Sequence, residues 1–242
     1  MRTLGKYFLF LFKLVHHTER FNVYVTRVFD EGVKLGTSSI VIVTIVSTFI
    51  GAVTCVQTAF NLVSPFIQDS VIATVVRDMT ILELAPTILS VVLAGKVGSN
   101  IAGELGAMRI SEQVDALEVM GINSASYLVL PKIIAALITF PALVILAAFL
   151  GIGGGMIAGV LANVISVQDY QQGLLASFNP FTITFAMTKS FVFAFLITSI
   201  SAYKGYHTQG GALEVGKSST SAVTNSCIAV LFADYILADI ML

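Results

Sequence analysis

Residues 133–165 read IIAALITFPALVILAAFLGIGGGMIAGVLANVI and contain no charged side chain. A helix needs about 20 predominantly apolar residues to cross a hydrocarbon core of about 30 Å. This stretch exceeds that length, and so do residues 38–63, which lie in a second uncharged interval between Lys34 and Asp69. The sequence therefore predicts an integral membrane protein with at least these two spanning helices.

Three further apolar runs are long enough to span a bilayer but contain ionisable side chains. They are residues 81–103 with Glu83 and Lys96, residues 181–203 with Lys189, and residues 218–237 with Asp234. Five spans give an all-α integral membrane protein whose two ends lie on opposite sides of the bilayer.

The composition excludes an ordinary soluble enzyme. Hydrophobic residues make up 56% of the chain and charged residues 11%, whereas soluble domains average about 25% charged residues. Cys55 and Cys227 stand alone in apolar runs, so we expect buried small side chains rather than metal ligands. We predict no catalytic residues, no metal site, no cofactor and no nucleic-acid partner.

The distribution of basic residues predicts the orientation of the spans. Lys and Arg concentrate in the N-terminal segment and in the second and fourth connections, at positions 2, 6, 13, 20, 27, 34, 109, 132, 204 and 217. The first connection carries Arg77, and the third carries no basic residue. Because cytoplasmic loops are enriched in Lys and Arg, we expect the N-terminus in the cytoplasm and the C-terminus outside.

Residues 1–34 form the segment before the first span, and an amphipathic helix is predicted within it. Apolar side chains recur there at helical spacing, at Leu4, Phe8, Leu11, Phe12 and Val15. Lys6, Lys13 and the other basic groups fall largely on other sides, which suits a helix in the cytoplasmic interface near anionic head groups. The alternative is a soluble helix packed on a partner protein.

Gly151, Gly155 and Gly159 form a doubled Gly-x-x-x-Gly pattern in the third span. Small residues on one helix face let two backbones approach closely in lipid. The pattern predicts a helix-packing seam, either within one chain or between two copies.

Residues 211–218, GALEVGKS, match the phosphate-loop pattern letter for letter. That chemistry needs a buried strand ending at the first glycine, but a polar turn precedes Gly211. We therefore reject a nucleotide site and expect a cytoplasmic loop that opens the fifth helix.

The second connection contains a short segment with features of a docking helix, at about residues 111–120. Ser111 can cap its start, Glu112 suits the positive end of a helix, and Gly121 can end it. The predicted apolar face consists of Val114, Leu117, Val119 and Met120, and the predicted acidic face of Glu112, Asp115 and Glu118, with Gln113 between them. We expect a soluble partner to bind this helix, and the alternative is a solvated surface helix.

Ionisable residues at membrane depth are costly and are therefore functional candidates. Lys189 and Asp234 lie at similar depths from the outer ends of antiparallel helices, so we predict an ion pair between them. Glu83 lies three residues before Pro86, where a kink can turn it toward a cavity, and Lys96 is expected to extend toward the cytoplasm.

Several motifs together resemble the MlaE/YrbE permease family over roughly residues 32–242. They are ELAP (83–86), AGKVG (94–98), ELGAMRISEQVDALEVMGIN (104–123), Lys189-Ser190, Gly205-Tyr206, Gly210-Gly211, GKSST (216–220) and Asp234-Tyr235. The resemblance implies a permease domain over residues 35–242 of an ABC transporter that moves phospholipids between the inner and outer membranes of a bacterium.

The same resemblance implies partners and site roles. The expected partners are a second copy of the chain, two cytoplasmic ATPase subunits that bind the ATP and a periplasmic ring of MCE-domain proteins, and a small STAS-domain subunit also fits. Residues Ser111, Glu112, Gln113, Asp115, Leu117, Glu118, Met120 and Gly121 would belong to the coupling helix. Residues Glu83, Pro86, Lys96, Lys189 and Asp234 would line or support a lipid cavity, with the chain in the bacterial inner membrane and its C-terminus periplasmic.

Two residues depart from the family pattern. The family often has an arginine where this chain has Leu82, and another where it has Lys96. An arginine that could contact a lipid phosphate is therefore absent.

A different class of function stays open at this point. In a secondary transporter or channel, Glu83, Lys189 and Asp234 would form an ion relay, although the chain shows none of the duplicated halves from which many such proteins are built. A membrane scaffold without transport activity is a third possibility.

Overall fold

The computed structural model describes residues 2–15, 21–62 and 68–241, and every regular element within these ranges is a helix. Five helical runs are long and apolar enough to cross a membrane: Tyr24–Asn61, Ser70–Ile110, Ser124–Leu161, Phe181–Tyr206 and Ala212–Met241. The predicted class, an all-α membrane protein with five spans and an additional N-terminal helix, is confirmed.

The first crossing is longer than predicted. Helix α1 covers Arg2–Val15, and helix α2 covers Phe21–Asn61. The predicted boundary at residue 34 therefore falls inside α2. The predicted end of the span at residue 63 lies outside the described residues, as do His16, His17 and Arg20.

The second crossing is a chain of α-helical and π-helical segments. Three α-helices, α3 (Ser70–Met79), α4 (Leu89–Leu93) and α5 (Ser99–Ile110), alternate with two π-helical segments, η1 (Thr80–Ile88) and η2 (Ala94–Gly98). Pro86 cannot donate a backbone hydrogen bond, and a proline inside a helix disturbs the regular ladder. Glu83 lies in η1 and Lys96 in η2, so both ionisable residues of the predicted span occupy π-helical turns.

The remaining elements are α6 (Gln113–Val119), α7 (Ser124–Leu161), α8 (Val167–Leu175), α9 (Phe181–Tyr206) and α10 (Ala212–Met241). Helix α8 occupies a segment that we expected to be a loop. Ser166 caps it by accepting a hydrogen bond of 3.1 Å from the backbone of Asp169. The phosphate-loop-like stretch forms the first turns of α10 instead of a loop before it.

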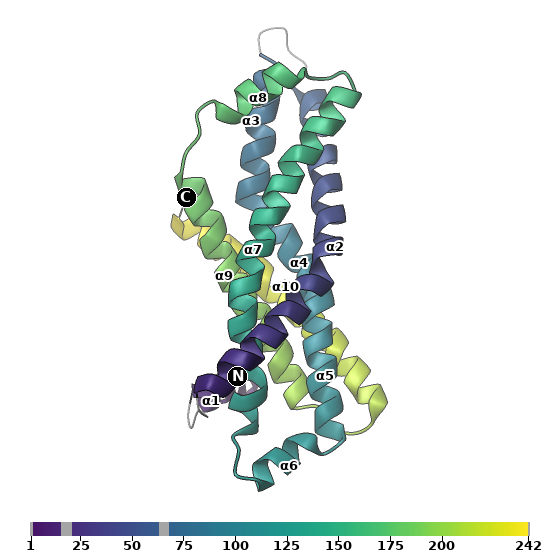
Figure 1. Cartoon of the computed structure of the whole chain (residues 1–242), viewed down its shortest axis with the longest axis vertical. Helices are drawn as coiled ribbons and strands as arrows, with labels where there is room; N and C mark the ends of the chain where they lie inside the picture. Colours follow the sequence, from purple (N-terminus) through teal and green to yellow (C-terminus); the bar gives the residue numbers. More distant parts are fainter. Residues whose placement is uncertain (1, 16–20, 63–67, 242) are drawn as a thin grey trace.

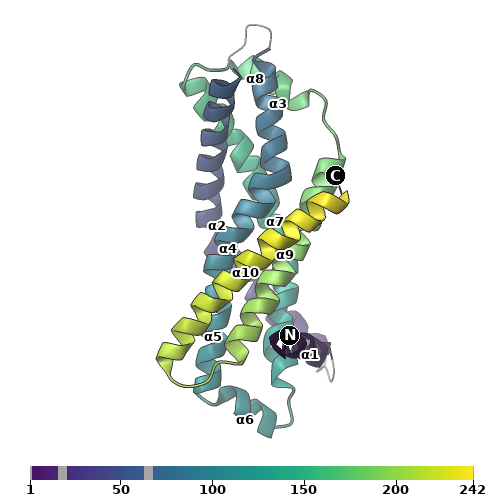
Figure 2. The ribbon, with the colours of Figure 1, turned by 180° about the vertical axis from the view of Figure 1, so that it is seen from behind.

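The two ends of the bundle carry different elements (Figure 1). Helix α8 and the start of α3 lie at one end, and α6 and the connection between α9 and α10 lie at the other, with α1 close by. Helix α10 crosses the bundle obliquely, and its C-terminus stops well short of the end that carries α8 (Figure 2). Helices α2, α3 and α7, together with α8, therefore extend beyond α9 and α10 on that side.

Helices α2 and α7 pack with their backbones in direct contact. A Cβ atom at Gly51 of α2 would lie 1.8 Å from the carbonyl oxygen of Gly151, and one at Gly154 would lie 2.4 Å from that of Thr48. Gly155 faces Gly51, Val76 and Tyr170 in the same way, and Gly159 faces Cys55 and Ile165. The glycine seam therefore packs against α2, α3 and α8 of the same chain.

Helix α10 is the least buried of the crossings. Only 17% of its most apolar window is buried in the chain, compared with 50% for α9. Thr220, Thr224 and Asn225 lie on its exposed side, near the middle of the helix. The hydroxyls of Thr220 and Thr224 donate to backbone carbonyls of α10 itself, whereas lipid offers no hydrogen-bonding partner to the exposed amide of Asn225.

Candidate functional site

The coupling segment begins with a reversal of the chain after α5. The hydroxyl of Ser111 donates to the carbonyl of Ala107 over 2.8 Å, so Ser111 closes the end of α5. The prediction that Ser111 caps the start of α6 is therefore wrong. Glu112 precedes α6 instead, in the left-handed region at φ 61°, which a non-glycine residue adopts at a cost of about 1–2 kcal/mol.

The other end of α6 closes as the sequence predicts. Gly121 has φ 80°, and its N–H donates to the carbonyl of Glu118 over 3.0 Å. The N–H of Ile122 donates to the carbonyl of Leu117 over 3.1 Å. These two bonds form a Schellman motif, which needs a left-handed residue and therefore favours glycine.

The apolar side chains of the coupling segment point in two directions. Val114 is fully buried and Leu117 is partly buried, whereas Val119 is 89% and Met120 is 66% exposed. The prediction that these four side chains form a single apolar face is therefore wrong. One pair anchors the helix to the bundle, and the other pair is exposed on α6, which lies at one end of the molecule (Figure 1).

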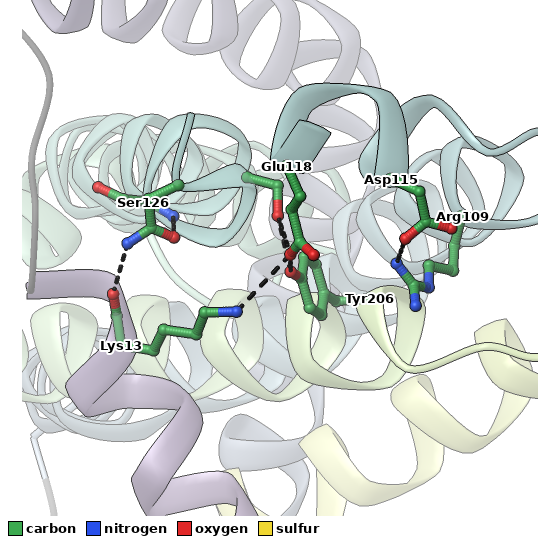
Figure 3. A network of polar contacts seen from close by, with 8 residues as sticks. Lys13, Arg109, Asp115, Glu118, Ser126 and Tyr206 are labelled. Atoms are coloured by element: carbon green, nitrogen blue, oxygen red, sulfur yellow. Dashed lines mark hydrogen bonds and ion pairs between the residues drawn. The ribbon is translucent and has the colours of Figure 1, made fainter. Parts of the chain in front are cut away.

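The acidic side chains also divide. Asp115 pairs with Arg109 at 2.5 Å, and Glu118 turns toward the bundle, where it accepts hydrogen bonds from Ser124 at 2.8 Å and Tyr206 at 3.0 Å. Lys13 of α1 approaches the same oxygen of Glu118, Oε1, at 3.6 Å. Figure 3 shows these groups converging from α1, α6 and α9. Glu118 therefore contributes to internal contacts rather than to a continuous acidic face.

These groups lower the pKa of Glu118: the hydrogen bond from Ser124 is the largest cause, and the hydrogen bond from Tyr206 and the positive charges of Lys13 and Arg109 add to it. An unperturbed glutamate titrates near pH 4.3. The carboxylate therefore stabilises the fold fully above that pH, and this contribution is lost as pH falls through the lowered pKa. At neutral pH Glu118 is charged.

The second candidate site is a cluster of charges inside the bundle. Lys189 of α9 is 1% exposed, and its Nζ lies 2.6 Å from Oδ1 of Asp234 in α10. The predicted ion pair is therefore confirmed. The same ammonium group also lies 2.8 Å from Oε2 of Glu83 in η1, a contact that we did not predict.

Neutral groups complete this cluster. The carbonyl of Leu82 accepts a hydrogen bond from Lys189 at 3.2 Å, and Thr87 donates to Asp234 at 3.0 Å. The ring of Phe185 lies 4.6 Å from the ammonium nitrogen. Two carboxylates share one cation, so the ionised cluster carries a net negative charge, and it faces outward through the half-exposed side chain of Glu83.

Lys96 joins two crossings. Its ammonium group donates to the backbone carbonyl of Ser38 in α2. This contact connects η2 to α2, and the extension of Lys96 toward the cytoplasm stays a prediction.

A further charge network was missed by the sequence analysis. Lys132 is 3% exposed and pairs with Glu31 at 2.6 Å and with Glu104 at 3.0 Å, and Lys34 pairs with Glu104 at 2.9 Å. These contacts hold α2, α5 and α7 together on the side of α6. The sequence does place opposite charges near the same end of three spans, and this pattern could have indicated the network. The predicted span began after Lys132, however, whereas α7 begins at Ser124 and buries that lysine.

The chain resembles known proteins over nearly its whole length. The family model Permease MlaE matches residues 28–240. A probable ABC transporter permease of Rickettsia bellii is 35% identical over 239 residues, which cover 99% of this chain and 92% of the relative. One from Synechocystis is 32% identical over 86% of this chain and 78% of the relative.

A plant protein shares part of this similarity. The chloroplast protein TRIGALACTOSYLDIACYLGLYCEROL 1 of Arabidopsis thaliana is 38% identical over 157 residues, which cover 65% of this chain and 45% of the relative. The match to the family model extends through the coupling segment and into all five crossings described above. The chain is a member of the MlaE permease family of ABC transporters, and an ABC transporter permease implies an ATPase partner.

Proposed function

We propose that this permease provides the membrane path for phospholipids moving between the inner and outer membranes of a bacterium, and that a cytoplasmic ATPase drives the movement through α6. The observation that carries the coupling role is the exposed pair Val119 and Met120 at the end of the bundle. A similarity to a protein named after a galactolipid supports a lipid as the substrate.

Helix α6 has the properties of a connector between two proteins. Val114 and the internal contacts of Glu118 fix it to the bundle, and Val119 and Met120 present an apolar surface beside the exposed Glu112. Apolar groups next to a charge suit a mixed groove on a soluble partner. We assign that groove to the ATPase subunit.

The charge cluster supports the lipid path. Glu83 exposes half of its side chain at membrane depth while Lys189 holds it in place, and Pro86 is buried in the same π-helical turn. We propose that Glu83, Lys189 and Asp234, with Lys96 further along the same crossing, form the polar wall of a lipid cavity. The cluster of Glu83, Lys189 and Asp234 carries a net negative charge when ionised, and the wall lacks an arginine at Leu82, so this part of the wall suits a head group with a cationic part.

A second copy of the chain would close this cavity. The exposed amide of Asn225 on α10 would gain a hydrogen-bonding partner from a second copy, and Asp234 lies on the same helix. We therefore propose a homodimer in the inner membrane, with the N-terminus cytoplasmic and the C-terminus periplasmic. The outer end with α8 would bear the MCE-domain ring, and a STAS-domain subunit would bind at the cytoplasmic side.

One observation favours the alternative of an ion relay. Glu83, Lys189 and Asp234 are in direct contact, as a proton or ion pathway would require. Vesicles containing the permease alone separate the two functions, because a relay conducts ions without an ATPase. Lipid transport should need both the ATPase and ATP.

The coupling role is tested by the substitution Val119→Asp. Val119 is 89% exposed, so the fold should tolerate the change, whereas a carboxylate in an apolar contact should reduce co-purification of the ATPase at least about tenfold. Leu213→Asp is the matched control, because Leu213 is 74% exposed at the same end of the bundle but lies on α10. Equal ATPase recovery with both variants would remove the coupling role of α6.

A further inference from the structure

Helix α1 is fixed to the bundle by one side only. Phe10 is 4% exposed, and its ring lies 5.4 Å from that of Tyr206 and 5.6 Å from that of Tyr203. One turn earlier, the hydroxyl groups of Tyr7 and Ser199 are 2.7 Å apart. These contacts attach α1 to the last turns of α9, next to the coupling segment.

The opposite side of α1 has an apolar arc bordered by lysines. Phe8 and Leu9 are 66% and 71% exposed. Lys6 and Lys13 are also exposed, and they lie seven residues apart, so they stand above one another on the edge of the helix beside Leu9. This edge is the one nearer α6, because Lys13 reaches Glu118.

The contact between Lys13 and Glu118 is the weakest that Glu118 makes. The two side chains are 54% and 44% exposed, and their charged atoms are 3.6 Å apart. Meanwhile Asn123 donates to the backbone carbonyl of Lys13 over 3.0 Å, which holds the end of α1 in place without engaging the ammonium group. Lys13 can therefore change its partner while the helix stays docked.

We propose that the lysine edge of α1 binds the phosphate of an anionic phospholipid in the cytoplasmic leaflet, and that this binding draws Lys13 away from Glu118. The inference rests on the proposed function, in which α6 transmits the action of the ATPase. When Lys13 leaves, Glu118 loses its charge contact with α1 and keeps its hydrogen bonds with Ser124 and Tyr206, so α6 is held to the bundle by one contact fewer. The anionic lipid therefore frees α6 to move and raises the rate of coupled ATP hydrolysis.

The chemistry of the arc favours a lipid as the ligand. Exposed ion pairs contribute little stability, whereas each lysine near an anionic membrane strengthens binding about fivefold. An aromatic and aliphatic arc beside a row of lysines is the arrangement of helices that lie at a membrane surface. Helix α1 also packs on α7 and α9, both of which are spanning helices, so its exposed side continues the surface that faces the bilayer.

The location of α1 can be measured on the permease alone. The chain contains no tryptophan, so Phe8→Trp introduces a single fluorophore on the exposed arc. Brominated acyl chains in reconstituted vesicles should quench its emission at least twofold. Emission that is unaffected by the brominated lipid would show that water or a protein covers the arc, and would overturn the proposal.

The link to α6 is measured on the complete complex in nanodiscs. Raising the fraction of phosphatidylglycerol in phosphatidylcholine should increase the ATPase rate severalfold, and Lys13→Gln should give a high rate that no longer responds. Lys217→Gln is a matched control because Lys217 and Glu214 form a similarly exposed pair, 63% and 44%, at the same end of the molecule. This control should respond like the original chain.

Three outcomes would overturn the proposal: a Lys13→Gln complex that still responds, an unmodified complex that does not respond, or a Lys217→Gln complex whose response is also lost. Inorganic phosphate should not replace the lipid, and an equal response to it would assign the edge to free phosphate. If no ATPase associates with the chain at all, the proposed function fails, whereas the quenching experiment still reports on the lipid site.

Discussion

Lys189 is the least exposed charged residue among those that the structure describes. It is buried to 1% exposure between two carboxylates contributed by different crossings. Burial of a lone charge is costly, so each member of the cluster depends on the others. Lys189 therefore has a structural role, in addition to the role in the lipid cavity that we propose.

Replacement of Lys189 by Met should lower the free energy of unfolding by about 3–5 kcal/mol, because the substitution leaves Asp234 nearly buried without its cation. The midpoint of thermal unfolding in detergent measures this effect. Adding Asp234→Asn to the same chain should recover a large part of the loss, since the uncompensated charge is then removed. Lys217→Met, at an exposed pair, should change stability by less than about 0.5 kcal/mol.

The sequence predicted the pair of Lys189 and Asp234 because helical rise alone places both at similar depths. It did not predict Glu83 as a partner, because that contact depends on how the second crossing packs against α9 and on the π-helical turn around Pro86. The capping role of Ser111 was predicted wrongly for a related reason. A serine can cap the start of one helix or bond back to the end of another, and the left-handed turn at Glu112 decides between them.

At the level of elements, the contact of α2 with α7 depends on individual glycines. Gly154 lies against the backbone of Thr48, whereas a Cβ at the neighbouring Gly153 would meet nothing within 4 Å. These adjacent positions on one helix therefore provide a matched pair for testing the packing.

Gly154→Ala should destabilise the protein by about 1–3 kcal/mol, because a methyl group cannot fit against the Thr48 carbonyl without moving α2 away from α7. Gly153→Ala should be neutral or stabilising by up to about 1 kcal/mol, since alanine favours the helix. Unfolding midpoints of the two variants in the same detergent provide the comparison. Equal midpoints would contradict the close packing of these helices.

The number and order of the crossings followed from hydropathy, but their lengths did not. Helix α2 begins at Phe21, because charged residues such as Lys34 and Glu31 find partners on α5 and α7 and do not end the helix. Helix α8 was not predicted, because its nine residues are too polar and too few to resemble a spanning helix. The family motif located α6, but sequence spacing could not show which of its side chains turn inward.

At the scale of the whole molecule, α10 is the crossing that its own chain buries least. Its exposed side carries Asn225 near the middle of the helix, where lipid offers no hydrogen bond. A second copy of the chain would supply the missing contact.

A homodimer through α10 is tested by cysteine crosslinking in membranes. In a chain with Cys55 and Cys227 replaced by Ala, Asn225→Cys should give a crosslinked dimer with a short bifunctional maleimide, because both copies present the same face to each other. Ile157→Cys, on a 58% exposed position of α7, should remain monomeric. A dimer band of equal strength for both positions would indicate random collision.

The π-helical turns of the second crossing affect how force passes through the membrane. This crossing runs from α5, next to α6, to the opposite end of the bundle near α8, and wide turns interrupt it at Thr80–Ile88 and Ala94–Gly98. Helices bend most readily at such turns. If α6 transmits the action of the ATPase as proposed, a displacement at the end that carries α6 should rotate the part of this crossing near α8 about the turn that contains Glu83, so that this carboxylate stays nearly fixed while the helix on either side of it moves.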